Sequence, residues 1–184
     1  MVKNWDGSDA DQTTQADLVK LLVKDGRLKT AELIEVYTKV DRAFFLPAEL
    51  PSEKVYCDTP LTMQHCDVHQ SAPHMYAIML EQLKLQPGMS FLNVGSGTGY
   101  LSTLAAFFTG TEGVNHGIEW SASNTKLAKD AVGKFLASAG VYAPVKFTHA
   151  NAFHLDVEKN IKYGHREPNP QSPVPARRLL ISRS

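Results

Sequence analysis

The sequence has few cysteines, no excess charge of either sign and no long apolar run. Its two cysteines, Cys57 and Cys66, are too few for a disulfide framework. The 19 basic residues balance the 19 acidic ones, so bulk charge does not indicate nucleic acid or a membrane surface as a partner. No apolar run is long enough to cross a bilayer, and no basic-then-apolar leader opens the chain. We therefore expect a cytoplasmic protein with no nucleic-acid or membrane partner.

The length and composition favour one folded domain with a tail at each end. With 184 residues, 43% of them hydrophobic, the chain can bury one sizeable core. Residues 1–12 are polar and rich in aspartate, which predicts a mobile N-terminal tail. Residues 164–184 are rich in proline and arginine, which predicts a disordered segment. The folded domain is then expected over residues 13–163.

Three helices are predicted before the centre of the chain. Thr14-x-x-Asp17 is a capping box, and the helix that it opens should end at Gly26. A second helix is expected from Ala31 to about Val40.

The third predicted helix follows Ser71, which we expect as its N-cap with a proline in the first turn. Its predicted buried face comprises Met75, Ile78, Met79 and Leu83. A hydroxyl at a helix N-terminus can bind an anion, and it can equally do no more than cap the helix.

The central stretch, residues 91–100, is an apolar run that breaks into alternating glycines and then restarts as a helix. Glycine lets the backbone turn sharply and come close to a ligand, at the point where the following helix directs its free N–H groups. A second strand-like run, residues 114–119, ends in Glu119, where a ribose diol needs an acceptor. With a third run at residues 145–149, the order is strand, helix, strand, helix, strand, which is half of a doubly wound parallel sheet.

A metal site is not expected. His65, Cys66 and His69 are three potential ligands close together, but no fourth donor follows at a spacing typical of zinc sites.

Four segments of the sequence carry a resemblance to a known family. They are Asp41-Arg42-Ala43, Tyr56-x-Asp58-x-Pro60, Ser71-Ala72-Pro73-His74-Met75 and Asn93-Val94-Gly95-Ser96-Gly97-Thr98-Gly99-Tyr100. With them, the chain from about Asp17 to Tyr163 resembles the protein-L-isoaspartate O-methyltransferase family. The resemblance implies an α/β, Rossmann-like methyltransferase fold, S-adenosyl-L-methionine as cofactor, and isoaspartyl-containing proteins as the substrates of a repair reaction.

The resemblance also implies roles for individual residues. Transfer of a methyl group from a sulfonium to a carboxylate needs no proton removed, so the main task is alignment. Ser71 is implied as the catalytic residue that binds the substrate carboxylate, and His74 as a substrate-binding residue. For His74 a buried, hydrogen-bonded histidine is the alternative reading.

The cofactor-binding set implied by the resemblance runs along the carboxyl ends of the strands. The glycine turn would hold the methionine moiety, Glu119 the ribose hydroxyls, and Ala150 with Asn151 the adenine edge. An exposed acid at a strand end is the alternative for Glu119. The full set is Ser71, Asn93, Gly95, Ser96, Gly97, Gly99, Glu119, Ala150 and Asn151.

Several departures from the family pattern favour a second hypothesis. Asn93 and Asn151 stand where the enzymes usually carry acids, and residues 65–70 replace a loop containing glycine and glutamine. Residues 65–69, 91–94 and 113–119 resemble a divergent branch regarded as substrate adaptors of cullin ubiquitin ligases. The hypotheses are therefore an isoaspartyl methyltransferase, or a cofactor-binding adaptor with ubiquitin-ligase components as partners.

The proline-rich end of the chain predicts an incomplete sheet. From residue 164 the sequence does not continue into a fourth strand, so we expect the C-terminal half of the sheet to be missing. The strand at residues 91–94 would then be an exposed apolar edge.

Overall fold

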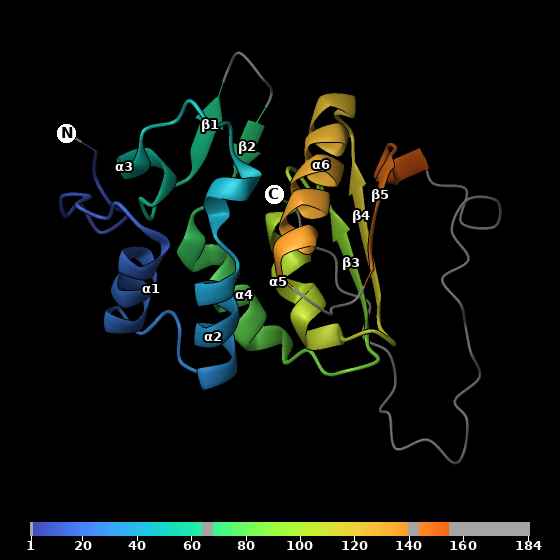
Figure 1. Ribbon diagram of the computed structural model, residues 1–184, viewed down its shortest axis with the longest axis horizontal. Helices are drawn as coiled ribbons and strands as arrows, with labels where there is room; N and C mark the ends of the chain where they lie inside the picture. The colour runs from blue at the N-terminus through green and yellow to red at the C-terminus, as the bar shows by residue number, and fades with distance from the viewer. Residues whose placement is uncertain (1, 64–67, 140–143, 155–184) are drawn as a thin grey trace.

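The computed structural model describes residues 2–63, 68–139 and 144–154. The helices are α1 (Gln15–Lys24), α2 (Ala31–Lys39), η1 (Arg42–Phe45), α3 (Ser52–Val55), α4 (Pro73–Leu83), α5 (Tyr100–Thr109), α6 (Ala122–Ala139) and η2 (Ala152–His154). The strands are β1 (Leu61–Met63), β2 (Val68–Gln70), β3 (Ser90–Val94), β4 (Val114–Glu119) and β5 (Val145–His149). Figure 1 shows α5 and α6 against the sheet, with α2, α4 and then α1 farther from it.

The central sheet has the order β3-β4-β5 and is parallel throughout. Helices α5 and α6 make the two crossovers, as the sequence predicts. Within the described residues β3 pairs with β4 alone, but its apolar side chains are not exposed. Phe91 belongs to the core beside α5, and Leu92 packs with Ile118 on the opposite face of the sheet. The expected exposed apolar edge is therefore wrong for these side chains.

A partly buried histidine lies on the face of the sheet that bears Leu92. His116 of β4 makes a hydrogen bond of 3.1 Å with the Thr148 hydroxyl of β5. Burial lowers the pKa of this histidine, and the positive charge of Lys146 lowers it further.

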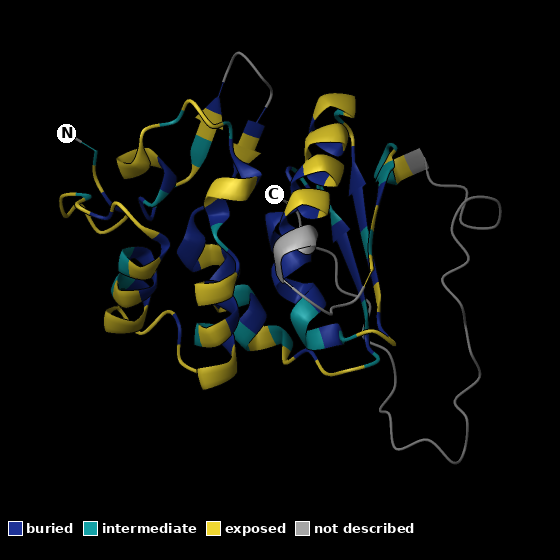
Figure 2. Cartoon of the chain, in the orientation of Figure 1, coloured by how far each residue is buried: buried dark blue, intermediate teal, exposed yellow. Residues whose placement is uncertain are grey.

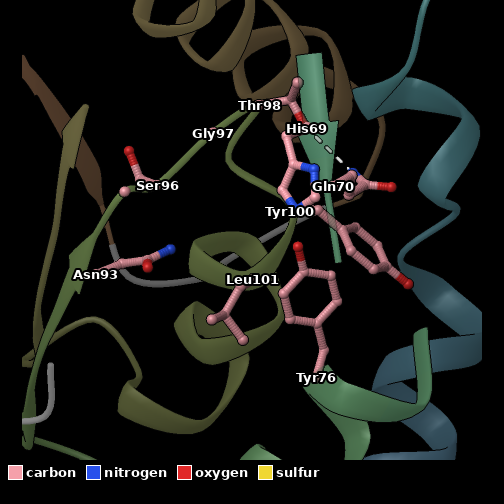
Figure 3. Close-up of a pocket in the computed structure, with 10 residues that line it drawn as sticks. His69, Gln70, Tyr76, Asn93, Ser96, Gly97, Thr98, Tyr100 and Leu101 are labelled. Carbon is pink, nitrogen blue, oxygen red and sulfur yellow. Dashed lines mark hydrogen bonds between the residues drawn. The ribbon is translucent and has the colours of Figure 1, made fainter. Parts of the chain in front are cut away.

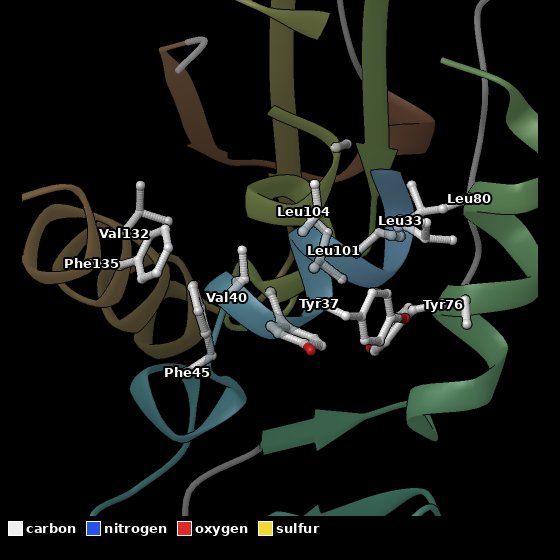
Figure 4. Packing of buried hydrophobic residues seen from close by; sticks show 14 of the residues in the cluster. Leu33, Tyr37, Val40, Phe45, Tyr76, Leu80, Leu101, Leu104, Val132 and Phe135 are labelled. Atoms are coloured by element: carbon white, nitrogen blue, oxygen red, sulfur yellow. The ribbon is translucent and has the colours of Figure 1, made fainter. Parts of the chain in front are cut away.

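The main core lies between the sheet and the helices. Helix α5 is buried on nearly all sides, because it packs on the sheet with one face and towards α2 with another (Figure 2). Phe45 and Phe135 contact each other at a ring distance of 6.1 Å, which joins η1 to α6 (Figure 4). Phe135 also contacts the rings of Phe44 and Phe107. These aromatic contacts link the N-terminal helices to the sheet domain.

The first two predicted helices are confirmed. Thr14 is the N-cap of α1, and its hydroxyl accepts a hydrogen bond from the Asp17 N–H at 3.2 Å. Thr30 is the N-cap of α2, but its side chain makes no capping hydrogen bond. Instead, a carboxylate oxygen of Glu81 in α4 accepts the N–H groups of Lys29 and Thr30. This cap comes from a distant part of the chain and ties α4 to the start of α2.

The predicted buried face of α4 is wrong for two of its four residues, Met75 and Ile78, which are 48% and 36% exposed. Met79 and Leu83 are partly buried and pack against the core, as predicted. The fully buried face comprises Tyr76, Ala77 and Leu80. The segment is apolar at nearly every position, so spacing alone does not determine which face turns inward.

The N-terminal segment, expected to be a mobile tail, packs against the end of α3. A bridge between Lys3 and Asp9 closes residues 3–9 into a small loop. The buried side chain of Asn4 accepts a hydrogen bond from the Asp58 N–H, and the Trp5 N–H donates to the Asp58 carbonyl. This segment therefore forms hydrogen bonds to the backbone of Asp58, which follows α3. Residues 164–184, expected to be disordered, lie outside the described residues.

Candidate functional site

The glycine-rich turn joins the end of β3 to the start of α5. Gly97 has φ +53° and Gly99 has φ +90°, in the left-handed region that favours glycine. A Cβ atom on Gly99 would lie 2.8 Å from the ring of Phe147, so this position has no space for a side chain. The turn thus has the sharp form that the sequence predicts, and α5 begins directly behind it.

Glu119 closes the turn from the neighbouring strand. One of its carboxylate oxygens accepts a hydrogen bond from the Gly97 N–H at 2.7 Å, and the other accepts one from the Ser121 N–H at 2.9 Å. The side chain is 8% exposed, so the alternative of an exposed acid is wrong. A carboxylate has about four lone-pair sites, and these two bonds leave roughly two for hydroxyl donors.

A small pocket lies between the turn, the β1–β2 hairpin and α4 (Figure 3). Its lining residues are His69, Gln70, Tyr76, Asn93, Gly95, Ser96, Gly97, Thr98, Tyr100 and Leu101. The space among them is about 10 Å³, which is room for about one water molecule. This pocket by itself therefore does not hold a nucleoside-sized ligand.

Four of the predicted cofactor residues line this pocket directly. Asn93, Gly95, Ser96 and Gly97 all come from the end of β3 and the turn. Asn93 is buried and donates to the Ser102 hydroxyl at 3.1 Å, so it acts here as a neutral hydrogen-bonding group. Among the described residues, the buried Ser96 hydroxyl has no hydrogen-bond partner. A polar ligand in the pocket would satisfy it.

Ser71 lies beside the pocket but does not cap α4. The N-cap is Ala72, with Pro73 as the first helical residue, so the predicted N-cap is wrong by one position. The Ser71 N–H donates to the Tyr76 hydroxyl at 3.0 Å, and Tyr76 lines the pocket. Burial raises the pKa of Tyr76, which keeps its hydroxyl protonated. Because Ala72 is the N-cap, the Ser71 hydroxyl is not used to cap the helix.

His74 points to a different set of partners. Its Nδ1 lies 3.0 Å from both carboxylate oxygens of Asp58, and its ring lies 5.5 Å from that of Trp5. His74 and Asp58 are both buried, and His74 does not line the pocket. This arrangement matches the alternative reading of a buried, hydrogen-bonded histidine.

The residues expected at the adenine edge lie at the same end of the sheet as Glu119. The Ala150 N–H donates to the Glu119 carbonyl at 2.9 Å. The Asn151 side chain accepts a hydrogen bond from the Phe153 N–H, so it caps η2. Trp120 and Phe153, which the sequence analysis did not single out, expose their rings beside these residues in the chain, by 71% and 83%. The available signal was an aromatic residue directly after the strand-end acid Glu119 and another two residues after Asn151.

Sequence reasoning also missed Gln70, Tyr76 and Thr98. All three line the pocket, and Gln70 and Thr98 are joined by a hydrogen bond of 3.2 Å (Figure 3). For two of them the only signal in the sequence was position, because Gln70 precedes Ser71 and Thr98 lies between two glycines of the turn.

Of the three potential metal ligands, His65 and Cys66 lie outside the described residues. The third, His69, makes a hydrogen bond of 2.9 Å with Thr62 through Nδ1. In the part of the chain that the structure describes, no group of three or more His, Cys, Asp or Glu side chains could hold a metal ion. The described helices include none with the length and apolarity to span a membrane.

Comparison with known families gives a match over most of the chain. The family model of protein-L-isoaspartate(D-aspartate) O-methyltransferase matches residues 13–151. A protein-L-isoaspartate O-methyltransferase of Triticum aestivum is 43% identical over 104 residues, which cover 55% of this chain and 44% of the relative. One from Ignicoccus hospitalis is 39% identical over 103 residues, covering 56% and 48%. The chain thus spans about half the length of these curated relatives.

Solved structures agree on the fold. A crystal structure of a Plasmodium falciparum protein-L-isoaspartate O-methyltransferase with S-adenosyl-L-homocysteine has a TM-score of 0.66 at 24% identity, covering 80% of this chain and 67% of that one. A second protein-L-isoaspartate O-methyltransferase has a TM-score of 0.64 at 24% identity, covering 76% and 43%. The fold is therefore the α/β, Rossmann-like fold of methyltransferases, as expected.

Proposed function

Because the chain belongs to the protein-L-isoaspartate(D-aspartate) O-methyltransferase family, we propose that it binds S-adenosyl-L-methionine and methylates the free carboxylate of isoaspartyl residues in damaged proteins. The observation that carries the proposal is the hydrogen bond between the Gly97 N–H and Glu119. It joins the glycine turn to the strand-end acid beside a pocket that Ser71 approaches through Tyr76.

The residues present fit this cofactor. Glu119 keeps acceptor capacity for a ribose diol, and the unpartnered Ser96 hydroxyl offers a bond to a polar ligand. The exposed rings of Trp120 and Phe153 supply apolar surface near Asn151, where the adenine edge is expected. When bound, S-adenosyl-L-methionine supplies a methyl group on a sulfonium.

The chain's own residues contribute alignment rather than acid–base chemistry. A carboxylate oxygen attacks without losing a proton, so no general base is required. Ser71 is the group that we assign to the substrate carboxylate, because its hydroxyl is not used as a helix cap. The glycine turn and Glu119 then hold the cofactor in line, and such alignment can supply much of the rate. His74 pairs with Asp58 and does not line the pocket, so we assign it no contact with the reacting groups.

The proposal is tested with the chain as it stands. Isothermal titration measures binding of S-adenosyl-L-methionine, and methyl release is followed on an isoaspartyl peptide and on the same peptide with an ordinary aspartate. We expect binding, and transfer to the isoaspartyl peptide alone. Binding without transfer would restrict the chain to the cofactor-binding part of the reaction, and the absence of both would refute the proposal.

A serine variant locates the substrate site. Ser71→Ala should lower kcat/KM for the peptide about 10- to 100-fold, the loss of one hydrogen bond to a charged group. Its affinity for S-adenosyl-L-methionine should fall much less. Ser52→Ala is the matched control, because Ser52 is exposed on α3. Equal kinetics for the two variants would remove Ser71 from the mechanism.

The adaptor hypothesis is not carried further. The family match and the curated relatives are described as methyltransferases, and neither they nor the described residues indicate a ubiquitin-ligase component as partner.

A further inference from the structure

A line of hydrogen bonds crosses the wall of the pocket from Arg42 through Gln70 to Thr98. Arg42 Nη2 donates to Gln70 Oε1 at 2.7 Å, and Gln70 Nε2 donates to the Thr98 hydroxyl at 3.2 Å. All three side chains are buried. Figure 3 shows the Gln70 carboxamide reaching towards Thr98 above the ring of Tyr76. Nothing in the proposed cofactor or substrate roles uses this line.

The direction of each bond is fixed by Arg42. A guanidinium has only donors, so the oxygen of the Gln70 carboxamide must face Arg42 and its nitrogen must face Thr98. The Thr98 oxygen is consequently the acceptor. Its own proton is then free to be donated to another group, and Thr98 lines the pocket.

Arg42 is an unusual anchor because the hydrogen-bond acceptors of its guanidinium, among the described residues, are neutral. The side chain is 0% exposed, and besides Gln70 it donates to the Cys57 carbonyl at 3.4 Å. Among the described residues no carboxylate forms an ion pair with Arg42, and its Nε has no hydrogen-bond partner. The free-energy cost of burying such a cation depends strongly on each oxygen that accepts a hydrogen bond from it. Gln70 provides its shortest hydrogen bond.

The line joins the two parts of the proposed active site. Gln70 is the last residue of β2 and directly precedes Ser71, while Thr98 belongs to the glycine turn. The backbones are also close, because a Cβ on Gly97 would lie 3.5 Å from the His69 carbonyl oxygen. The Gln70 side chain therefore ties the end of β2, which Ser71 follows, to the glycine turn.

We propose that Gln70 is a positioning residue, which Arg42 orients so that it holds Ser71 and the glycine turn in register and leaves the Thr98 hydroxyl as a hydrogen-bond donor to the pocket. The consequence for methyl transfer rests on the proposed function. The coupling between β2 and the turn does not.

The first variant is Gln70→Glu. A carboxylate keeps the bond to Arg42 and gives the buried cation a counterion, but it has no proton for Thr98, so the Thr98 hydroxyl turns and donates its own proton to the carboxylate. The melting temperature should therefore stay at or above that of the wild type. Amide hydrogen exchange over residues 95–99 should stay close to that of the wild type, because the bond between residue 70 and Thr98 is reversed and not lost. Exchange in α1 should not change.

Variants of Thr98 provide the matched comparison. Thr98→Val removes the hydroxyl and should accelerate exchange over residues 95–99 about two- to tenfold, the effect of losing one hydrogen bond, whereas Thr98→Ser keeps the hydroxyl and should behave like the wild type. The double variant of Gln70→Glu and Thr98→Val should show no more acceleration than Thr98→Val alone, because Thr98→Val already breaks the bond. Gln70→Met should instead lower the melting temperature, because it leaves Arg42 without its main acceptor.

Two results would overturn the proposal. The first is wild-type exchange over residues 95–99 in Thr98→Val. The second is acceleration spread evenly over the whole protein, which is the mark of a merely structural residue. Exchange is measured without cofactor, so a wild-type chain that fails to bind S-adenosyl-L-methionine refutes the proposed function and leaves this test intact. If the wild type binds, Gln70→Glu and Thr98→Val should each weaken binding about two- to tenfold, and Thr98→Ser should not.

Discussion

Replacing Glu119 by glutamine tests whether the strand-end acid holds the glycine turn. The carboxylate accepts two backbone N–H groups, one from Gly97 and one from Ser121, and the side chain is almost fully buried. A carboxamide has one oxygen acceptor and one nitrogen that only donates. In Glu119→Gln one of the two N–H groups must therefore lose its acceptor.

The size of the effect follows from these two bonds. A hydrogen bond to a charged group contributes about 1.5–3 kcal/mol, and the variant loses about one of them. In a chain of this length each kcal/mol changes the melting temperature by roughly 2–4 °C. We therefore expect Glu119→Gln to melt about 3–12 °C below the wild type.

Thermal melts followed by circular dichroism at pH 7 measure this difference. The matched control is Glu112→Gln, because Glu112 is exposed in the turn before β4 and the substitution removes the same charge. Melting of Glu119→Gln within about 1 °C of that control would refute the reasoning, since the two backbone bonds would then contribute nothing. If the proposed function holds, the same variant also binds S-adenosyl-L-methionine more weakly.

Three further changes probe the turn, the core and the sheet. Gly99→Ala should destabilise the protein by more than Gly7→Ala, because both have positive φ but only Gly99 lies against an aromatic ring; chemical denaturation measures the difference. Phe135→Ala should cost about 3–5 kcal/mol of unfolding free energy in the same assay, and the exposed Phe153→Ala close to none. The lowered pKa of His116 means that the unfolded chain takes up a proton first as pH falls through about 6.5. Stability should therefore be greatest above that pH and fall below it, and melts between pH 8 and pH 5 should show a shallower decline in His116→Gln.

The sequence predicted features whose cause is local. The three strands, the glycine turn and the end of β4 at Glu119 follow from apolar runs and glycine spacing, because neighbouring residues decide these conformations. The capping box at Thr14 is of the same kind. Each could be assigned without knowing what packs against it.

Features decided by distant parts of the chain were missed or wrong. The inward face of α4 depends on its packing against α2, and its nearly continuous apolar sequence hides that choice. The predicted N-cap of α4, Ser71, was wrong by one residue, because Pro73 is the first helical residue and Ala72 is the N-cap before it. The partner of His74 is Asp58, 16 residues away, and no spacing rule predicts that pair.

The pocket wall also has a consequence for the order in which the protein folds. The hydrogen bonds from the Arg42 N–H to the Gln15 side chain, from the Arg42 side chain to Gln70 and from Gln70 to Thr98 span 27, 28 and 28 residues. Each of these contacts closes a long loop, and the entropy of closure must be met before the contact contributes. The helices and the glycine turn can form early from nearby residues, so competence to bind a ligand should arrive in the slowest kinetic phase of refolding.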